Sequence, residues 1–361
     1  MTLSGAKPIA CLEELRIHLQ FAIGLELSTI PVYLTGLYSI VDGENTAASS
    51  VIQSVVIEEM LHMALAGNVL NAIGGVPSTD CIDGKDPIPH FPTIISFLPS
   101  LGVINLRRFS REALDTFIKI EHPDSAVPDP NCEGYSSIGA FYAAISRGIK
   151  DHCPPKVFEE ARETRAGCQI ESTEFYGGAG VLIPVCDQAS ALAAIETIVE
   201  QGEGISEEVL QDQAKEHGVV PANLISVDDG NKLADCWKMY SHYARFLEIR
   251  EGRRFEPDQV IEEVPRGDVL PRDWDQVYPM ADNPQAKEYR DTDIASAVDE
   301  FNQTYTTLID NIYHAFNGES HKMRRAVTVM WDLKYQARAL MKTPSPVHLG
   351  ETVGAPFEYL R

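Results

Sequence analysis

The sequence predicts an all-α protein, and two observations support this fold class. Apolar residues recur every three or four positions toward both ends of the chain, a pattern typical of helices that pack on a core. Between these regions, many prolines divide the chain into stretches too short for long regular elements. We therefore expect a helical core that carries long loops, and we assign residues 1–361 to a single domain.

Two core helices are expected near the N-terminus. The first spans about residues 9–38, and the second spans about residues 45–73. The second ends where Gly74 and Gly75 precede Pro77, because glycine readily terminates a helix and proline cannot continue one. Apolar positions wrap around nearly the whole of the second helix, so we expect it to be buried on several sides.

The middle of the chain is expected to be mostly irregular. Residues 76–135 are rich in proline, and long loops of this kind inside a compact protein are usually functional. Shorter helices are expected near residues 110–120 and at residues 137–151. The other predicted helices are two core helices at about residues 189–202 and 231–250 and two accessory helices at about residues 294–316 and 321–341.

The charge balance is acidic: 53 Asp and Glu residues oppose 30 Lys and Arg residues, for a formal net charge of −23. Such a surface repels phosphate backbones and anionic lipids, so we expect neither nucleic acid nor a membrane as a partner. The 7 cysteines are widely spaced and form no C-x-x-C pair, which argues against a disulfide framework or a cysteine-ligated zinc. Residues 1–10 lack the pattern of a secretory signal, and we expect a cytoplasmic protein.

Four titratable residues stand inside apolar helix stripes, where core residues are expected. Glu26 lies within the stripe of the first helix, and Glu59 and His62 form a Glu-x-x-His pair on one face of the second. His242 lies in a stripe of the fourth predicted core helix. A buried carboxylate is costly without a cation or hydrogen bonds, so these positions indicate binding partners.

A row of like charges lies on the third predicted core helix. Glu196, Glu200 and Glu203 share one face at spacings of four and three residues. Their side chains repel one another unless the row is solvated or shares a cation.

Each of these residues also has a simpler explanation when it is taken alone. Glu26 can pair with an arginine, His242 can be a hydrogen-bonded core histidine, and the acidic row can be a solvated face. Glu58, which precedes Glu59, is ambiguous because both edges of its helix are apolar.

The order of these residues along the chain favours a metal site. One Glu, one Glu-x-x-His pair, a further Glu and a further His fall on four successive core helices. This is the ligand pattern of a carboxylate-bridged dimetal site inside a helix bundle. Carboxylates combined with imidazoles suit iron or manganese better than a metal that prefers thiolates. We therefore expect a pair of ions, either iron or manganese.

Four runs of the sequence carry a family resemblance. They are Glu26-Leu27-Ser28-Thr29-Ile30-Pro31, Ile57-Glu58-Glu59-Met60-Leu61-His62, Ile198-Val199-Glu200-Gln201-Gly202 and Ser241-His242-Tyr243-Ala244-Arg245-Phe246. Together they resemble the ferritin-like domain of the iminophenyl-pyruvate dimer synthase family, which is related to chromopyrrolic acid synthase and to the coupling enzyme of the violacein pathway. The likeness continues at residues 106–123, 138–142 and 354–358. It implies a ferritin-like four-helix bundle with two extra C-terminal helices and long loop insertions.

Carried over position by position, the resemblance implies as metal ligands Glu26, Glu59, His62, Glu200 and His242. Met239 is a departure, because it stands where a symmetric ferritin-like site has a second carboxylate and cannot replace one. Glu203, one turn beyond Glu200, is a candidate sixth ligand, as is a water or hydroxide. A weak second site or a single metal ion stays open.

The resemblance also implies a function: a metal-dependent oxidase or oxygenase that uses dioxygen or peroxide on a small amino-acid-derived or aromatic substrate. Its specific reaction would be oxidative coupling of an α-imino acid in secondary metabolism. Two other classes remain, namely a ferritin or catalase relative that detoxifies peroxide or handles iron, and a binding module in which metal only holds the helices together. The sequence singles out no catalytic residue beyond the metal ligands, and it leaves open the substrate, a haem and the formation of a homo-oligomer.

Overall fold

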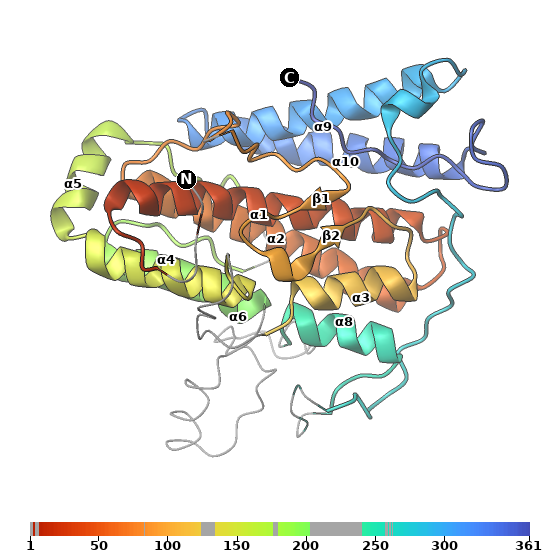
Figure 1. The fold of residues 1–361 in the computed structure, drawn as a ribbon, viewed down its shortest axis with the longest axis horizontal. Coiled ribbons are helices and arrows are strands. Elements are labelled where there is room, and N and C mark those ends of the chain that lie inside the picture. The colour runs from red at the N-terminus through yellow and green to blue at the C-terminus, as the bar shows by residue number, and fades with distance from the viewer. Residues whose placement is uncertain are drawn as a thin grey trace.

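A computed structural model arranges the helices in three layers (Figure 1). The middle layer is the pair α1 (Leu12–Ser39) and α2 (Thr46–Ala72), and the pair α9 (Ala295–Phe316) and α10 (His321–Lys342) packs on one side of it. Four shorter helices cover the other side: α3 (Arg111–Ile120), α4 (Ile138–His152), α6 (Gln188–Gly202) and α8 (His242–Glu251). The structure describes residues 3, 7–82, 84–123, 134–175, 180–202, 240–256, 259, 261 and 263–361.

The layers confirm the predicted all-α class, and the described residues contain only one small sheet. Its strands β1 (Thr93–Ile94) and β2 (Val103–Ile104) pair antiparallel within the predicted loop region. Helix α5 (Pro155–Thr164) is not predicted by the periodicity, because it buries only Phe158 and Ala161 and so has no continuous apolar stripe. Two short 3-10 helices complete the described elements, η1 (Pro99–Leu101) and η3 (Ala286–Tyr289).

The fourth predicted core helix is shorter in the structure than the sequence predicts. Tyr240 and Ser241 are not helical, and residues 231–239 lie outside the described residues. The hydroxyl of Ser241 accepts a hydrogen bond from the backbone N–H of Ala244 at 3.3 Å, which makes Ser241 the N-cap of α8. The prediction of a helix through residues 240–241 was therefore wrong, because an apolar stripe continues across a cap without marking it. His242 is the first residue of α8.

Serine caps also begin two of the other short helices. Ser110 accepts a hydrogen bond from the backbone N–H of Ala113 at the start of α3, and Ser137 accepts one from Ala140 at the start of α4. These caps fix where each helix begins against the α1–α2 pair. α3 contacts α1 and α8, and α8 also contacts α2.

One large hydrophobic cluster joins side chains from all three layers. The assignment of the whole chain to a single domain stays a prediction. Among the described helices, α1 has the length and hydropathy of a membrane span, and 89% of its most apolar window is buried inside the protein. Because α1 packs against helices of both outer layers, its apolar composition suits a core helix.

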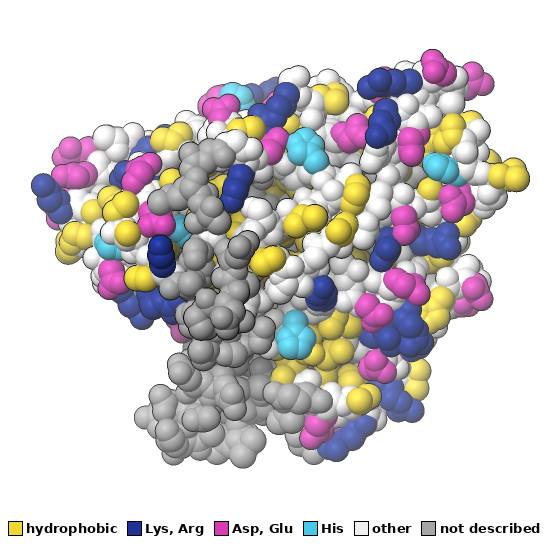
Figure 2. Space-filling model, in the orientation of Figure 1, with side chains coloured by type: hydrophobic (Ala, Val, Ile, Leu, Met, Phe, Trp, Pro, Cys, Tyr) yellow, Lys and Arg dark blue, Asp and Glu magenta, His cyan; other side chains and the backbone are white. Residues whose placement is uncertain are grey.

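Charged side chains of both signs are scattered over the face shown in Figure 2. Acidic and basic groups alternate over short distances there, and the described part of this face carries no large area of a single sign. The described part of this face therefore offers no single-sign patch to a charged partner.

Candidate metal centre

Four of the predicted ligands lie together between α1, α2 and the start of α8. Glu26 belongs to α1, Glu59 and His62 belong to α2, and His242 begins α8. All four side chains are buried. The Nδ1 atom of His62 lies 3.6 Å from Oε2 of Glu26 and 3.5 Å from Oε1 of Glu59. The same Oε1 of Glu59 lies 2.8 Å from Nδ1 of His242, so Glu59 stands between two imidazoles. Ligand atoms of Glu59, His62 and His242 all lie within 4.8 Å of one another.

Glu121 joins this cluster, although no periodicity in the sequence singles it out. It is the C-cap of α3, and its Oε2 lies 3.5 Å from Nδ1 of His242. The residue closes a short helix in the proline-rich region, so it belongs to no core stripe. The one signal in the sequence was its place in the run that resembles the family at residues 120–123.

Each imidazole is hydrogen-bonded through its Nε2 atom, on the side away from the carboxylates that face Nδ1. Nε2 of His62 lies 2.8 Å from Oε1 of Gln201, and Nε2 of His242 lies 2.8 Å from Oε2 of Glu58. These oxygens can only accept, so each Nε2 carries the hydrogen and donates it. In the neutral imidazole the lone pair is then on Nδ1, which faces the carboxylates. The buried Nδ1 of His242 lies 2.8 Å from Oε1 of Glu59 and 3.5 Å from Oε2 of Glu121.

Hydroxyl groups hold the other oxygen of each facing carboxylate. Tyr142 donates to Oε1 of Glu26, and Tyr33 donates to Oε1 of Glu121. Thr29 donates to Oε2 of Glu59 at 2.5 Å. Three carboxylates thus each have one oxygen fixed by a hydroxyl and the other turned toward an imidazole Nδ1. This is the arrangement in which hydrogen-bonded ligands point at a common centre.

The cluster contains more buried acid than base. Four buried carboxylates belong to it, Glu26, Glu58, Glu59 and Glu121, and among the described residues Arg245 is the permanent cation that contacts them. Arg245 donates to Glu58 and, at 2.9 Å, to Oγ of Ser54, which settles the ambiguous position of Glu58 as a buried ion pair. Even with both imidazoles protonated, one negative charge stays uncompensated. A buried charge of this kind must be neutralised by a proton or by a metal ion.

The pKa values follow from this imbalance. Burial, reinforced by Glu59, raises the pKa of Glu26 to about 7, although His62 opposes the shift. Burial alone would lower the pKa of His62, but Glu26 and Glu59 raise it to about 9. Burial would likewise lower the pKa of His242, but Glu121 and its other carboxylate neighbours raise it well above the ordinary value. In protein without metal the imidazoles thus keep protons, which a bound cation would displace.

The other predicted ligands, Glu200 and Glu203, are not seen in the described part of the cluster. Glu200, in the last turn of α6, is half-buried, and burial and Glu196 raise its pKa. Among the described residues it forms no hydrogen bond or ion pair with the cluster, whereas its neighbour Gln201 contacts His62. Its role as a ligand stays a prediction. Glu203 and Met239 lie outside the described residues.

The donor set fits a divalent metal ion. Ligand atoms of Glu59, His62 and His242 lie close enough together to hold one, and carboxylate oxygens of Glu26 and Glu121 lie beside the two imidazoles. Oxygen and imidazole donors of this kind suit iron and manganese. Nδ1 of His242, which is buried beside Oε1 of Glu59 and Oε2 of Glu121, is an atom that such an ion would bind in place of a proton.

The chain matches the family model described as Ferritin-like over residues 19–251, and it belongs to that family. The match covers most of α1, all of α2 and the four short helices that cover this pair, α3, α4, α6 and α8.

One well-characterised enzyme is similar to this chain over most of its length. Over 353 residues the chain is 27% identical to a dichlorochromopyrrolate synthase of Lentzea aerocolonigenes. The match covers 88% of this chain and 30% of the relative, so the chain spans less than a third of that protein's length. This relative confirms the resemblance to chromopyrrolic acid synthase and its kin.

A solved structure supports the fold. A ferritin-like protein from Caulobacter vibrioides, determined by crystallography, matches with a TM-score of 0.59 and 22% sequence identity. The match covers 98% of this chain and 100% of that one, so it extends to the helices beyond residue 251. It confirms the predicted ferritin-like arrangement.

Proposed function

We propose that this protein is a metal-dependent oxidase in which Glu26, Glu59, His62, Glu121 and His242 hold two iron ions. One observation carries the proposal: three carboxylate oxygens converge on two Nδ1 atoms whose imidazoles are fixed from behind. A closed structural site would not need the small cavity of about 20 Å³ that adjoins these side chains. That volume admits one water-sized molecule. When bound, iron at such a site supplies redox chemistry with dioxygen or peroxide.

The surrounding residues would orient the ligands and keep the centre dry. Burial holds the pKa of both Tyr33 and Tyr142 well above the ordinary value, so both phenols stay protonated and keep donating to their carboxylates. Leu25, Ile198 and Val199 close the small cavity with apolar surface. Water is thereby limited near the carboxylates, which strengthens every charge interaction there.

A larger cavity beside the centre is the proposed substrate site. Leu25 lines both the small cavity and this one, which has a volume of about 250 Å³. Phe21 and Phe97 contribute aromatic walls with ring centroids 5.7 Å apart. Nζ of Lys85 lies 5.8 Å from the centroid of Phe21. Asp86 also lines the cavity, but Arg361 and His90 contact its two oxygens at 2.6 and 2.8 Å. An aromatic wall with a cation whose acidic neighbour is already paired suits an aromatic carboxylate.

These features support oxidative coupling of an aromatic α-imino acid as the reaction. Joining two such molecules through a new carbon–carbon bond removes two protons and two electrons. One hydrogen peroxide molecule accepts both and becomes two waters, so the step balances with peroxide as oxidant. The chain spans only part of its curated relative, so this activity is proposed from the site and not carried over from that protein.

Metal analysis tests the centre directly. Purified protein should contain about two equivalents of iron or manganese per chain, as expected for a carboxylate-bridged pair. Glu59→Ala should lose both ions because this residue is shared, whereas Glu121→Gln should lose about one. Glu196→Gln, on the neighbouring helix, is the matched control and should keep full content. Full metal content in Glu59→Ala would overturn the proposed centre.

Product analysis tests the reaction. Aromatic α-imino acids, generated from the amino acids by an amino-acid oxidase, should give a coupled dimer that mass spectrometry detects. Lys85→Met should raise KM about tenfold with little change in kcat, because it removes one charge-assisted contact. Lys287→Met, an exposed lysine elsewhere, should behave as wild type. Rapid breakdown of peroxide without any dimer would instead favour the detoxifying class.

A further inference from the structure

A second cavity lies on the opposite side of α1 and α2 from the metal centre. It lies between this pair and the α9–α10 pair and has a volume of about 150 Å³. Its walls come from the outer faces of α1 and α2, whose inner faces carry Glu26, Glu59 and His62. The two cavities share helices but no lining residue, so the proposed oxidase site does not account for this one.

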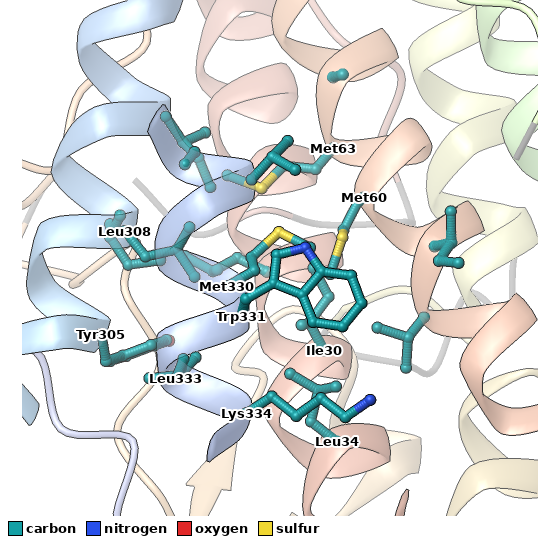
Figure 3. Close-up of a pocket in the computed structure, with 18 of the residues that line it drawn as sticks. Ile30, Leu34, Met60, Met63, Tyr305, Leu308, Met330, Trp331, Leu333 and Lys334 are labelled. Atoms are coloured by element: carbon teal, nitrogen blue, oxygen red, sulfur yellow. The ribbon is translucent and has the colours of Figure 1, made fainter. Parts of the chain in front are cut away.

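The cavity is long and narrow. Its lining residues run from Leu27 to Tyr38 on α1 and from Met323 to Lys334 on α10. Each of these stretches is about 16 Å long at the rise of an α-helix. The walls are mostly apolar, and methionine side chains, which adapt to irregular ligands, contribute sulfur atoms from both sides (Figure 3).

Two polar residues of the cavity, Tyr305 and Lys334, lie toward the same end. Figure 3 shows Lys334 and Leu34 at that end and Met63 at the other, with Tyr305 beside Leu333 and the side chain of Lys334 pointing away from Tyr305. The hydroxyl of Tyr305 is buried, and it has no hydrogen-bond partner among the described residues. A buried hydroxyl without a partner costs free energy, so its presence beside a cavity indicates a ligand atom that would pair with it.

Lys334 supplies a cation at the same end. Its Nζ lies 5.3 Å from the ring centroid of Trp331, and in the described part of the chain no carboxylate lies within ion-pair distance of it. Asp42 is close enough to feel this charge, but Arg338 and Lys342 already contact both of its oxygens at 2.5 Å. The ammonium of Lys334 is therefore available to an anion at the mouth of the cavity.

We propose that this cavity binds a linear apolar carboxylate, such as a medium-chain fatty acid. Its carboxylate would accept a hydrogen bond from Tyr305 and pair with Lys334, whose flexible side chain would turn toward it, and its chain would extend between the helix pairs toward Met63. A narrow apolar channel with polar groups at one end fits this shape better than it fits a compact ring system. The ligand is thus distinct from the substrate of the metal centre in both position and chemistry.

Direct binding tests the proposal on the full chain. Decanoate should bind with about one site per chain by isothermal titration calorimetry and should change the fluorescence of Trp331, which is half-exposed at the cavity. Decanol, which has the same chain without the charge, should bind more weakly. Failure of decanoate to bind up to millimolar concentration would overturn the proposal.

Two variants separate the head-group contacts from general effects. Lys334→Gln should weaken decanoate about tenfold and leave decanol unchanged, because one charge-assisted contact is lost. Arg325→Gln, an exposed charge on the same helix outside the cavity, is the matched control and should leave both affinities unchanged. Equal affinity of wild type and Lys334→Gln for decanoate would refute the assigned head group.

Two further variants address the hydroxyl and the channel. Tyr305→Phe should weaken decanoate without lowering the melting temperature, because the hydroxyl has no partner to lose in the described structure. Val327→Trp should block the channel and abolish binding, while metal content stays at the wild-type level. If this face instead joins two copies of the chain, sedimentation will show a dimer that Val327→Trp dissociates and decanoate will not bind, which would overturn the proposal.

Discussion

Arg245→Met should lower the free energy of unfolding of the metal-free protein by about 3 kcal/mol. The guanidinium of Arg245 is wholly buried, and it donates to Glu58 and, at 2.9 Å, to Oγ of Ser54. Without it, the buried carboxylate of Glu58 keeps only the imidazole of His242, whose Nε2 lies 2.8 Å away. Removal of one partner from a buried pair costs roughly 3–5 kcal/mol, and the remaining imidazole places this case at the lower end.

Two further variants show whether the loss of stability comes from the burial of the ion pair: one removes a surface ion pair, and the other removes both charges of the buried pair. Arg250 contacts Asp115 at 2.6 Å near the surface, so Arg250→Met should cost only about 0–1 kcal/mol. Combining Arg245→Met with Glu58→Gln should recover about 2 kcal/mol, because the amide oxygen still accepts from His242 but leaves no unpaired charge.

Urea denaturation followed by circular dichroism measures all four proteins. EDTA must be present throughout, because metal that binds only the folded state would add its own stabilisation. A loss for Arg245→Met within 1 kcal/mol of the loss for Arg250→Met would refute the reasoning, as would a double variant less stable than Arg245→Met alone.

Three other outcomes are expected. Chelation should lower the melting temperature, and Fe²⁺ or Mn²⁺ should restore it, since a ligand of the folded state stabilises that state; an unchanged melting curve would contradict a bound metal. Gly67→Ala should lower the melting temperature by roughly 2–4 °C, because the new Cβ would lie 2.3 Å from the ring of Phe316. An unchanged melting temperature would show that the ring of Phe316 moves aside at no cost. Burial raises the pKa of the Cys153 thiol to about 11. Iodoacetamide at pH 8 should therefore label exposed Cys186 and spare Cys153 until urea unfolds the chain. Equal labelling of both cysteines in the native protein, measured by peptide mass spectrometry, would contradict this prediction.

The long helices could be predicted closely from the sequence because helical periodicity is a local property. α1, α2, α6, α9 and α10 begin and end within three residues of their predicted bounds. The short α5 was missed and the start of α8 was misplaced, because a two-residue apolar face and a serine cap leave little periodic signal.

The candidate centre could be predicted only in part. Glu26, Glu59 and His62 stand in apolar stripes of α1 and α2, so their inward direction follows from helix geometry alone. Glu121 has no such stripe, because a loop residue is brought to the centre by the path of the chain after α3. Glu58, ambiguous in the sequence, is explained by Arg245, which lies far along the chain.

The sequence by itself determined the class of fold, the long core helices and the inward carboxylates and imidazole that make a metal site plausible, since all of these depend on spacing within one helix. Only the tertiary structure decided that Glu121 joins the buried cluster while, among the described residues, Glu200 lies apart from it. It also decided how the two imidazoles are oriented: Gln201 holds Nε2 of His62 and Glu58 holds Nε2 of His242, so each Nδ1 faces carboxylates. It also decided that α1 and α2 face a second, apolar cavity. These features arise from contacts between segments distant in the chain, which no local pattern encodes.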